Sequence, residues 1–150
     1  MALMATPYFA YGANMSRADM ARRCPGAGLV NGAVLPDHRF RINRRGVATV
    51  APEAAAQVHG VLWMITDADE RALDRYEGVA DGLYGKQRQR VYVQVGPVLE
   101  SVEGVEALIY VATDRSRGAP RAGYLDQVIA GAESHALPPE YVAEIRAWGA

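Results

Sequence analysis

Strand-forming segments gather in the middle of this sequence, and helical segments interrupt them at irregular intervals. Residues 58–65 are almost wholly apolar, which predicts a central strand, and residues 105–112 predict a second one. Shorter strands are predicted over residues 8–11, 29–35, 39–43, 47–50 and 91–95. This order differs from the regular alternation of strand and helix that builds a doubly wound parallel sheet. We therefore expect an α+β fold: a mixed, mostly antiparallel sheet or small β-barrel with flanking helices.

The predicted helices are marked by capping residues and by the spacing of apolar side chains. Ser16 is suited to cap a helix that ends before Pro25, and Thr66 is suited to cap a helix that ends near Gly78. Two further helices are predicted over residues 125–132 and from residue 139 onward. The order of predicted strands and helices therefore has no repeating unit.

Composition limits the kinds of protein that this chain can be. Its 150 residues suit a single domain over residues 1–150, and its net charge of −1 gives no basic excess for binding nucleic acid or an anionic membrane. No stretch reaches membrane-spanning length, and the first residues lack the pattern of a signal peptide. The single cysteine, Cys24, is typical of a reducing compartment. We expect a cytoplasmic protein.

Several common catalytic motifs are missing from the sequence. It has no Gly-x-Ser-x-Gly elbow, no Walker loop and no Gly-x-Gly-x-x-Gly motif. Its three histidines are far apart, and none has metal-ligand spacing with Cys24 or another histidine. We expect neither a metal ion nor a cofactor. An enzyme made from this chain would work with a carboxylate and backbone donors.

The stretch YFAYGANM, residues 8–15, passes from a predicted strand through a glycine turn directly to a helix start. Such a turn directs several backbone N–H groups to one point, and the beginning of a helix adds partial positive charge. Gly12 permits a close approach that a side chain would obstruct. The loop can hold a carboxylate or a developing oxyanion. A tight turn without a ligand also favours Gly and Asn, so the residues alone leave both interpretations open.

Glu77 lies at the predicted C-terminus of a helix, within the stretch LDRYEGVADGLY. A carboxylate at this end of a helix faces the negative end of the helix dipole, which raises its pKa. One interpretation is an exposed side chain on the last turn. The other is a partly buried acid and base that transfers protons near neutral pH. The spacing does not choose between them.

Four stretches in this order resemble the γ-glutamylcyclotransferase family, including its AIG2-like relatives: YFAYGANM, VHGVLWMI, LDRYEGVADGLY and GYLDQVIAGAESHALPPEY. The resemblance covers residues 8–141. The family's loop usually reads Tyr-Gly-Ser-Asn, whereas this chain has Ala13 at the serine position. The substitution removes a hydroxyl group but leaves the backbone N–H groups of the loop.

The resemblance implies a small mixed barrel with helices and a cofactor-independent reaction. In that reaction the α-amine of a γ-glutamyl group attacks its own γ-carbonyl, which gives 5-oxoproline and releases the attached amine. Glu77 falls on the family's catalytic glutamate. The residues implied to bind the substrate are Tyr8, Phe9, Ala10, Tyr11, Gly12, Ala13, Asn14, Met15, Tyr84, Tyr110 and Tyr124.

Other interpretations stay open at this point. The leaving group could be an amino acid, the ε-amine of a γ-glutamyl-lysine type compound, or an amine on a biosynthetic intermediate. The same pocket could bind a small γ-glutamyl compound without converting it. Arg115, Arg117 and Arg121 could bind a substrate carboxylate, although we favour solvated loop charges. The resemblance also suggests a homodimer.

Overall fold

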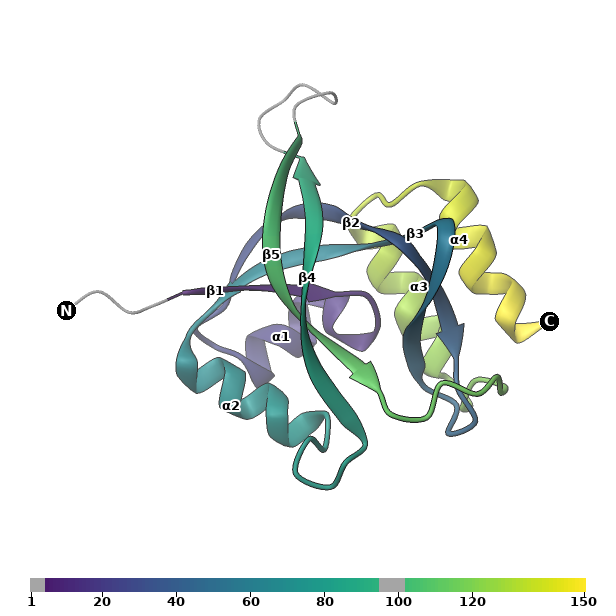
Figure 1. Ribbon diagram of the computed structural model, residues 1–150, viewed down its shortest axis with the longest axis horizontal. Coiled ribbons are helices and arrows are strands. Elements are labelled where there is room, and N and C mark those ends of the chain that lie inside the picture. The colour runs from purple at the N-terminus through teal and green to yellow at the C-terminus, as the bar shows by residue number, and fades with distance from the viewer. Residues whose placement is uncertain (1–4, 95–101) are drawn as a thin grey trace.

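Five strands close into a barrel in the computed structural model, which describes residues 5–94 and 102–150. The strands are β1 (Thr6–Ala10), β2 (Gly28–Ile42), β3 (Ala48–Ile65), β4 (Tyr84–Gln94) and β5 (Val102–Ala112). Their order around the barrel is β1-β3-β2-β4-β5, and Figure 1 labels the five strands. Only β1 and β5 pair in parallel, and the other pairs are antiparallel. The expected mixed, mostly antiparallel barrel is therefore confirmed.

The β2–β3 hairpin corrects the sequence prediction. The segments predicted as separate strands over residues 29–35, 39–43, 47–50 and 58–65 are parts of these two long, curved strands. Register shifts between Pro36 and His38 mark a bulge, and Asp37 there has a φ of 58°. The Asp37 carboxylate accepts a hydrogen bond from the Ala55 N–H at 3.0 Å. Proline is tolerated at a bulge, so Pro36 bends the strand instead of ending it.

The helices flank the barrel in two groups (Figure 1). They are α1 (Arg17–Arg23), α2 (Asp67–Tyr76), α3 (Tyr124–Ser134) and α4 (Pro139–Arg146), with short 3-10 turns at Ala13–Met15 and Ala147–Gly149. Both predicted caps are present: Ser16 Oγ accepts from the Asp19 N–H at 3.1 Å, and Thr66 Oγ1 accepts from the Asp69 N–H at 3.1 Å. Among the described residues, no helix is long and apolar enough to cross a membrane.

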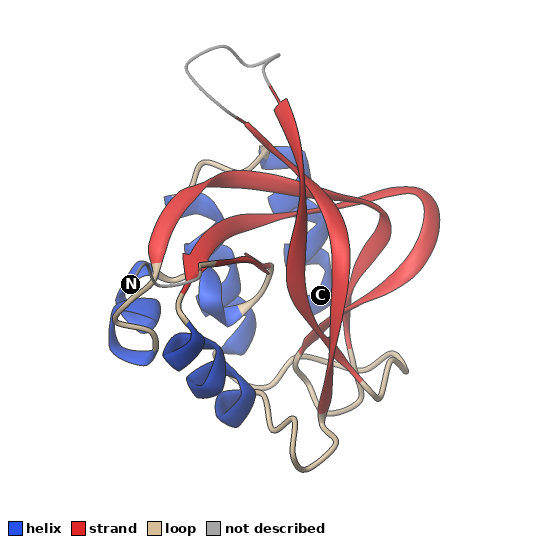
Figure 2. Cartoon of the chain, turned by 60° about the vertical axis from the view of Figure 1, so that its left-hand side comes forward, coloured by secondary structure: helices blue, strands red, loops and turns tan. Residues whose placement is uncertain are grey.

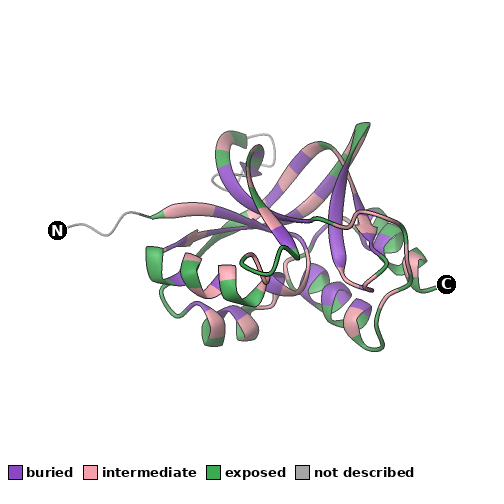
Figure 3. Cartoon of the chain, turned by 60° about the horizontal axis from the view of Figure 1, so that its bottom comes forward, coloured by how far each residue is buried: buried purple, intermediate pink, exposed green. Residues whose placement is uncertain are grey.

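The apolar core occupies the barrel interior and the contacts between the barrel and the helices. Phe9, Val58, Ile65, Ile109 and Ile145 are fully buried members of one cluster. Buried and more exposed positions alternate along β4, whereas the last six residues of β5, residues 107–112, are all buried (Figure 3). The strand predicted over residues 91–95 is part of β4, and its last residue lies outside the described part of the chain.

The topology places several chain segments around one end of β1. This short strand pairs with β3 on one side and with β5 on the other. The chain then turns through the 3-10 segment Ala13–Met15, which contacts α3. The C-terminus of α2 and the start of β4 lie at the same end of the barrel (Figure 2). The candidate site forms where these segments meet.

Candidate functional site

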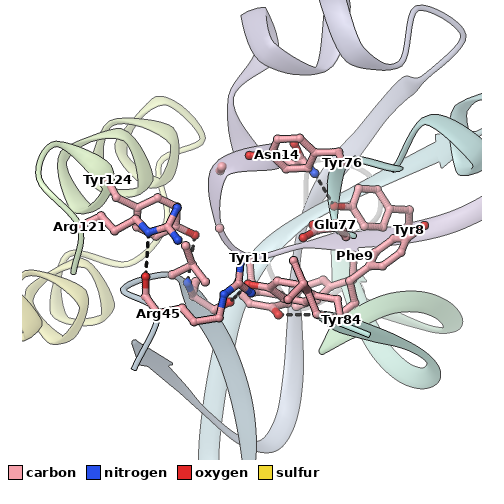
Figure 4. A pocket seen from close by; sticks show the side chains of 16 residues that line it. Tyr8, Phe9, Tyr11, Asn14, Arg45, Tyr76, Glu77, Tyr84, Arg121 and Tyr124 are labelled. Atoms are coloured by element: carbon pink, nitrogen blue, oxygen red, sulfur yellow. Dashed lines mark hydrogen bonds between the residues drawn. The ribbon is translucent and has the colours of Figure 1, made fainter. Parts of the chain in front are cut away.

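A cavity of about 220 Å³ lies at this end of the barrel. Figure 4 shows its side chains converging from β1, the turn after β1, the C-terminus of α2 and the N-terminus of α3. The cavity brings together residues that are far apart in the sequence. Those implied by the sequence that line it are Tyr8, Phe9, Tyr11, Gly12, Ala13, Asn14, Glu77, Tyr84, Tyr110 and Tyr124.

Ala10 and Met15 were also expected to contact the substrate, but they do not line this cavity. Ala10 is 2% exposed and Met15 is 0% exposed, and both belong to the apolar core. Met15 packs against α3 at Gly131, where an added Cβ would lie 3.1 Å from the Met15 Cβ. The reason is local geometry: Met15 ends the 3-10 turn and points away from the cavity into the helix contact.

Two hydrogen bonds hold the backbone of the turn after β1 in place. The Met15 N–H donates to the Gly12 carbonyl at 3.1 Å, and the Trp63 indole N–H donates to the Asn14 carbonyl at 3.1 Å. The first N–H groups of a helical turn have no partner within that turn. N–H groups of this kind can donate to an anion where they face a cavity.

Gly12 is placed where a side chain would crowd the cavity. An added Cβ would lie 3.2 Å from the Tyr124 hydroxyl oxygen and 3.4 Å from the Ala48 Cβ. The Tyr124 hydroxyl in turn accepts from the Ala48 N–H at 3.1 Å, so it has little freedom to move. The glycine lets the loop, β3 and α3 approach one another closely.

Glu77 caps the C-terminus of α2 and lines the cavity. Its N–H donates to the Leu73 carbonyl at 2.8 Å, and Gly78 then ends the helix with a φ of 65°. The side chain is partly buried, which matches the second of the two interpretations left open by the sequence. Burial raises the pKa of Glu77 from 4.5 to about 7, against the opposing effect of Arg23 and Arg45. Desolvation, and not the helix end that the sequence indicated, is the main cause.

The raised pKa makes folding stability depend on pH. The Glu77 carboxyl binds its proton more tightly in the folded state than in the unfolded state. The stability that this proton contributes is fully present below the unfolded pKa of 4.5, and it is lost as the pH rises through the folded pKa of about 7. The shift corresponds to at most about 3 kcal/mol. We expect the melting temperature of the wild type to fall more between about pH 5 and pH 8 than that of Glu77→Gln, which cannot titrate there. Equal slopes in parallel thermal melts would contradict the burial of this charge.

The tyrosine hydroxyls of the cavity wall are held by the protein. Tyr84 donates to the Ala48 carbonyl at 2.6 Å, and Tyr110 donates to the Asp74 carboxylate at 2.6 Å. Burial raises the pKa of Tyr84, Tyr110 and Tyr124 above the ordinary value. These tyrosines are therefore neutral near pH 7 and act as a rigid polar and aromatic wall.

Asn14 connects the cavity to α1. Its amide donates to the Tyr8 hydroxyl at 3.0 Å, and its carbonyl oxygen accepts from the Arg23 guanidinium. The Arg23 guanidinium carbon also lies 3.5 Å from the centre of the Tyr76 ring, a cation–π contact. This hydrogen bond and this cation–π contact hold the Arg23 guanidinium, and with it a positive charge, beside Glu77.

The cavity also contains residues that the sequence analysis did not assign to it. Arg121, which we expected to be a solvated loop charge, lines the cavity, although its side chain is also exposed. Arg117 instead stacks 4.9 Å from the Trp148 ring. No sequence signal distinguishes the loop arginines from one another. The other unassigned lining residues are Arg45, Val47, Ala48, Tyr76 and Leu83.

The described part of the chain contains no group of three or more His, Cys, Asp or Glu side chains that could hold a metal ion. The polar groups that face the cavity are instead Glu77, Arg45, Arg121, the tyrosines and the loop after β1. Together they offer one carboxyl that titrates near neutral pH, guanidinium donors and backbone N–H donors.

Comparisons with known proteins agree with this architecture. The model of the AIG2-like family matches residues 57–145. The chain is 26% identical to the human protein named gamma-glutamylcyclotransferase, over 93% of this chain and 77% of that protein. Its mouse counterpart is also 26% identical, with the same coverage. A solved structure named gamma-glutamyl cyclotransferase superimposes with a TM-score of 0.84 at 26% identity, covering 96% of this chain and 88% of that one.

Proposed function

This chain belongs to the AIG2-like family, and on that premise we propose that it is a γ-glutamyl cyclotransferase. The observation that carries the proposal is Glu77: a partly buried carboxyl with a pKa of about 7 that lines a cavity beside a loop of backbone donors. Similar proteins named for the same activity support the assignment.

The proposed reaction is an intramolecular aminolysis. The substrate's α-amine forms a bond to its own γ-carbonyl carbon, and the bond from that carbon to the leaving nitrogen breaks. The products are 5-oxoproline and a free amine. Nucleophile and electrophile belong to one molecule, so the protein needs no nucleophile of its own. Holding the substrate in a folded conformation can contribute about 7–11 kcal/mol relative to a bimolecular reaction.

Glu77 moves the proton in this proposal. The substrate amine has a pKa of about 8 or above, so much of it is protonated at neutral pH. The ionised Glu77 carboxylate accepts a proton from the amine as the ring closes. It then donates that proton to the departing nitrogen, which would otherwise leave as a poor, anionic group. A carboxyl with a pKa of about 7 is suited to both steps.

The loop after β1 supplies the donors for negative charge. Attack on the γ-carbonyl places negative charge on its oxygen, and fixed N–H groups stabilise that charge without reorganising. The Gly12 carbonyl accepts a hydrogen bond from the Met15 N–H at 3.1 Å, and the Asn14 carbonyl accepts one from the Trp63 indole N–H at 3.1 Å. These contacts hold the loop while its first N–H groups remain available to the substrate.

A panel assay tests the proposal. Purified protein is incubated with γ-glutamyl amino acids, γ-glutamyl-ε-lysine and γ-glutamyl amines, and 5-oxoproline release is measured by chromatography. We expect release from at least one class of compound. If no compound is converted but calorimetry shows binding, the protein binds γ-glutamyl compounds without turnover. That result would favour the alternative function, a binding protein that is not an enzyme.

The pH dependence of the rate follows from the same carboxyl. The pH dependence of kcat/KM reports the pKa values of the acid and base in the free enzyme. The acidic limb of this profile should therefore have a midpoint near pH 7, the pKa of Glu77. Activity should rise through this range, since the base must be ionised to accept a proton. A profile measured from about pH 5 to pH 9 with a constant ionic strength checks this. A midpoint near 4.5, the ordinary value for a glutamate, would contradict it.

A further inference from the structure

Lys86 is the only lysine in the sequence, and the other members of its 16 Lys and Arg residues are all arginines. It lies on β4, where its ammonium group donates to two carboxylates of α2, Glu70 at 2.5 Å and Asp74 at 3.2 Å. An ammonium is a compact charge whose three donors can serve separate acceptors, whereas a guanidinium holds its donors in a fixed plane. A lysine is therefore suited to bridge two carboxylates that lie one helical turn apart.

The bridge continues from Asp74 to the cavity wall. The Tyr110 hydroxyl, on β5, donates to the Asp74 carboxylate at 2.6 Å. Tyr110 lines the cavity, and its ring meets the Tyr8 ring edge to face with centres 5.8 Å apart. Asp74 thus ties α2 to both β4 and β5. We call the four residues Lys86, Glu70, Asp74 and Tyr110 the α2 clamp.

The charges of the α2 clamp are more shielded from solvent than the other ion pairs. The side chains of Lys86, Glu70 and Asp74 are 30%, 20% and 32% exposed. Each other ion pair among the described residues includes a side chain that is at least 42% exposed. Isolated exposed pairs contribute little, whereas a network of several charges can hold a geometry. Desolvation lowers the pKa of Lys86, but its hydrogen bonds to the two carboxylates outweigh that effect and raise the pKa, so the ammonium stays charged near pH 7.

The helix α2 has little apolar surface with which to fix its own orientation. Leu73 is its one buried apolar side chain, and its other buried residue, Asp69, belongs to the capping box at the start of the helix. At the other end, Tyr76 is 47% exposed. Helices in proteins are stabilised mainly by the packing of an apolar face, which is small here. The second half of α2 therefore depends on polar contacts, and Asp74 provides them three residues before Glu77.

The α2 clamp and the candidate acid and base share one face of the helix, because positions 70, 74 and 77 recur at helical spacing. We propose that Lys86 is a positioning residue, which holds α2 through Asp74 in the orientation that places Glu77 in the cavity. Lys86 is not part of the cavity lining, so it acts through Glu77 and not on the substrate. A displacement of about 1 Å can slow a reaction by about 10²-fold. The expected effect on rate rests on the proposed function.

Lys86→Met removes the charge and keeps most of the aliphatic stem. We expect kcat for 5-oxoproline release to fall about 10- to 100-fold, while KM stays within about threefold of the wild-type value. Lys86→Arg keeps the charge but not the three separable donors, so it should recover part of the loss. Asp74→Asn should also lower kcat, and the double variant with Lys86→Met should lose little more than either single variant, because the two side chains act as a unit.

Acetylation of the folded protein tests the same charge without a substitution. An acetylating ester of N-hydroxysuccinimide can modify only one side-chain amine, that of Lys86, besides the terminal α-amine, and acetylation removes the charge. Mass spectrometry locates the acetyl groups. The treated wild type should lose kcat as Lys86→Met does, whereas Lys86→Arg should keep its own kcat after the same treatment. This arm remains decisive if Lys86→Met fails to fold.

Arg88→Met is the matched control, because Arg88 is the next residue on the same face of β4, is exposed and lies outside the cavity lining. It should keep wild-type kinetics. If Lys86→Met and the acetylated wild type melt at a lower temperature but turn over at the wild-type rate, the contact is only structural and the proposal is overturned. A rise in KM with an unchanged kcat would overturn it too.

Hydrogen exchange separates this inference from the proposed reaction, because it needs no substrate. The Glu77 N–H donates to the Leu73 carbonyl at 2.8 Å in the last turn of α2. This amide should exchange at least about 10-fold faster in Lys86→Met than in the wild type, and at the wild-type rate in Arg88→Met. That result would support the α2 clamp even if no compound gave 5-oxoproline. Equal exchange in Lys86→Met and the wild type would show that Lys86 does not hold the end of α2, whatever the turnover.

Discussion

Glu77→Gln should lower kcat for 5-oxoproline release by about 10²- to 10⁴-fold, the usual contribution of a positioned acid and base. The amide has nearly the shape of the carboxyl but cannot accept the amine proton or donate to the leaving nitrogen. The side chain is partly buried at the end of α2, and Gln keeps the volume that this position requires. We therefore expect KM and the folded structure to change little. Steady-state kinetics with chromatographic detection, alongside circular dichroism, measures these effects.

Glu106→Gln provides the control for this substitution. Glu106 is an exposed residue of β5 outside the cavity lining, and the same chemical change there should leave kcat at the wild-type value. Turnover by Glu77→Gln at the wild-type rate would remove Glu77 from the mechanism, even if the family assignment stood.

Gly12→Val should reduce kcat/KM by at least about 100-fold, comparable to the loss of a fixed donor for the oxyanion. A Cβ at this position would lie 3.2 Å from the Tyr124 hydroxyl oxygen, and the two methyl groups of valine would extend into the cavity. The substitution should therefore weaken substrate binding as well as slow the reaction. Calorimetry with a γ-glutamyl compound and steady-state kinetics measure the two effects separately.

Gly28→Val controls for the general cost of adding a side chain. Gly28 lies on β2 with no atom within 4 Å of an added Cβ, so this variant should keep wild-type kinetics. If Gly12→Val fails to fold, Gly12→Ala provides the milder change, since only the Tyr124 contact must then adjust by a few tenths of an ångström. Unchanged kinetics in a folded Gly12 variant would show that the loop does not face the substrate.

Local signals in the sequence were sufficient for most of the secondary structure. Ser16 and Thr66 predict helix starts because their side chains accept N–H bonds within one turn, and the structure has both caps. The long β2 strand was divided wrongly, because Pro36 and Asp37 are typical of a turn. Whether such residues end a strand or form a bulge depends on the pairing partner, which a local pattern does not contain.

The site could be predicted only in part, for a similar reason. The loop after β1 and Glu77 are found from short motifs and from the family resemblance, and both line the cavity. No short motif in the sequence assigned Arg45 to the cavity. Its burial is decided by the turn at Asn43 and by Arg121, which is remote in the sequence. Contacts between distant segments leave no local sequence pattern.

Ring closure by the substrate's own amine is the central claim, and product analysis in ¹⁸O-labelled water tests it most directly. The wild type is incubated with a γ-glutamyl compound that it converts, and the products are identified by mass spectrometry. The account predicts 5-oxoproline and free amine in equal amounts, with no ¹⁸O in the 5-oxoproline, because water takes no part in the reaction. Glutamate that contains ¹⁸O as the primary product would show hydrolysis and would contradict the proposed chemistry.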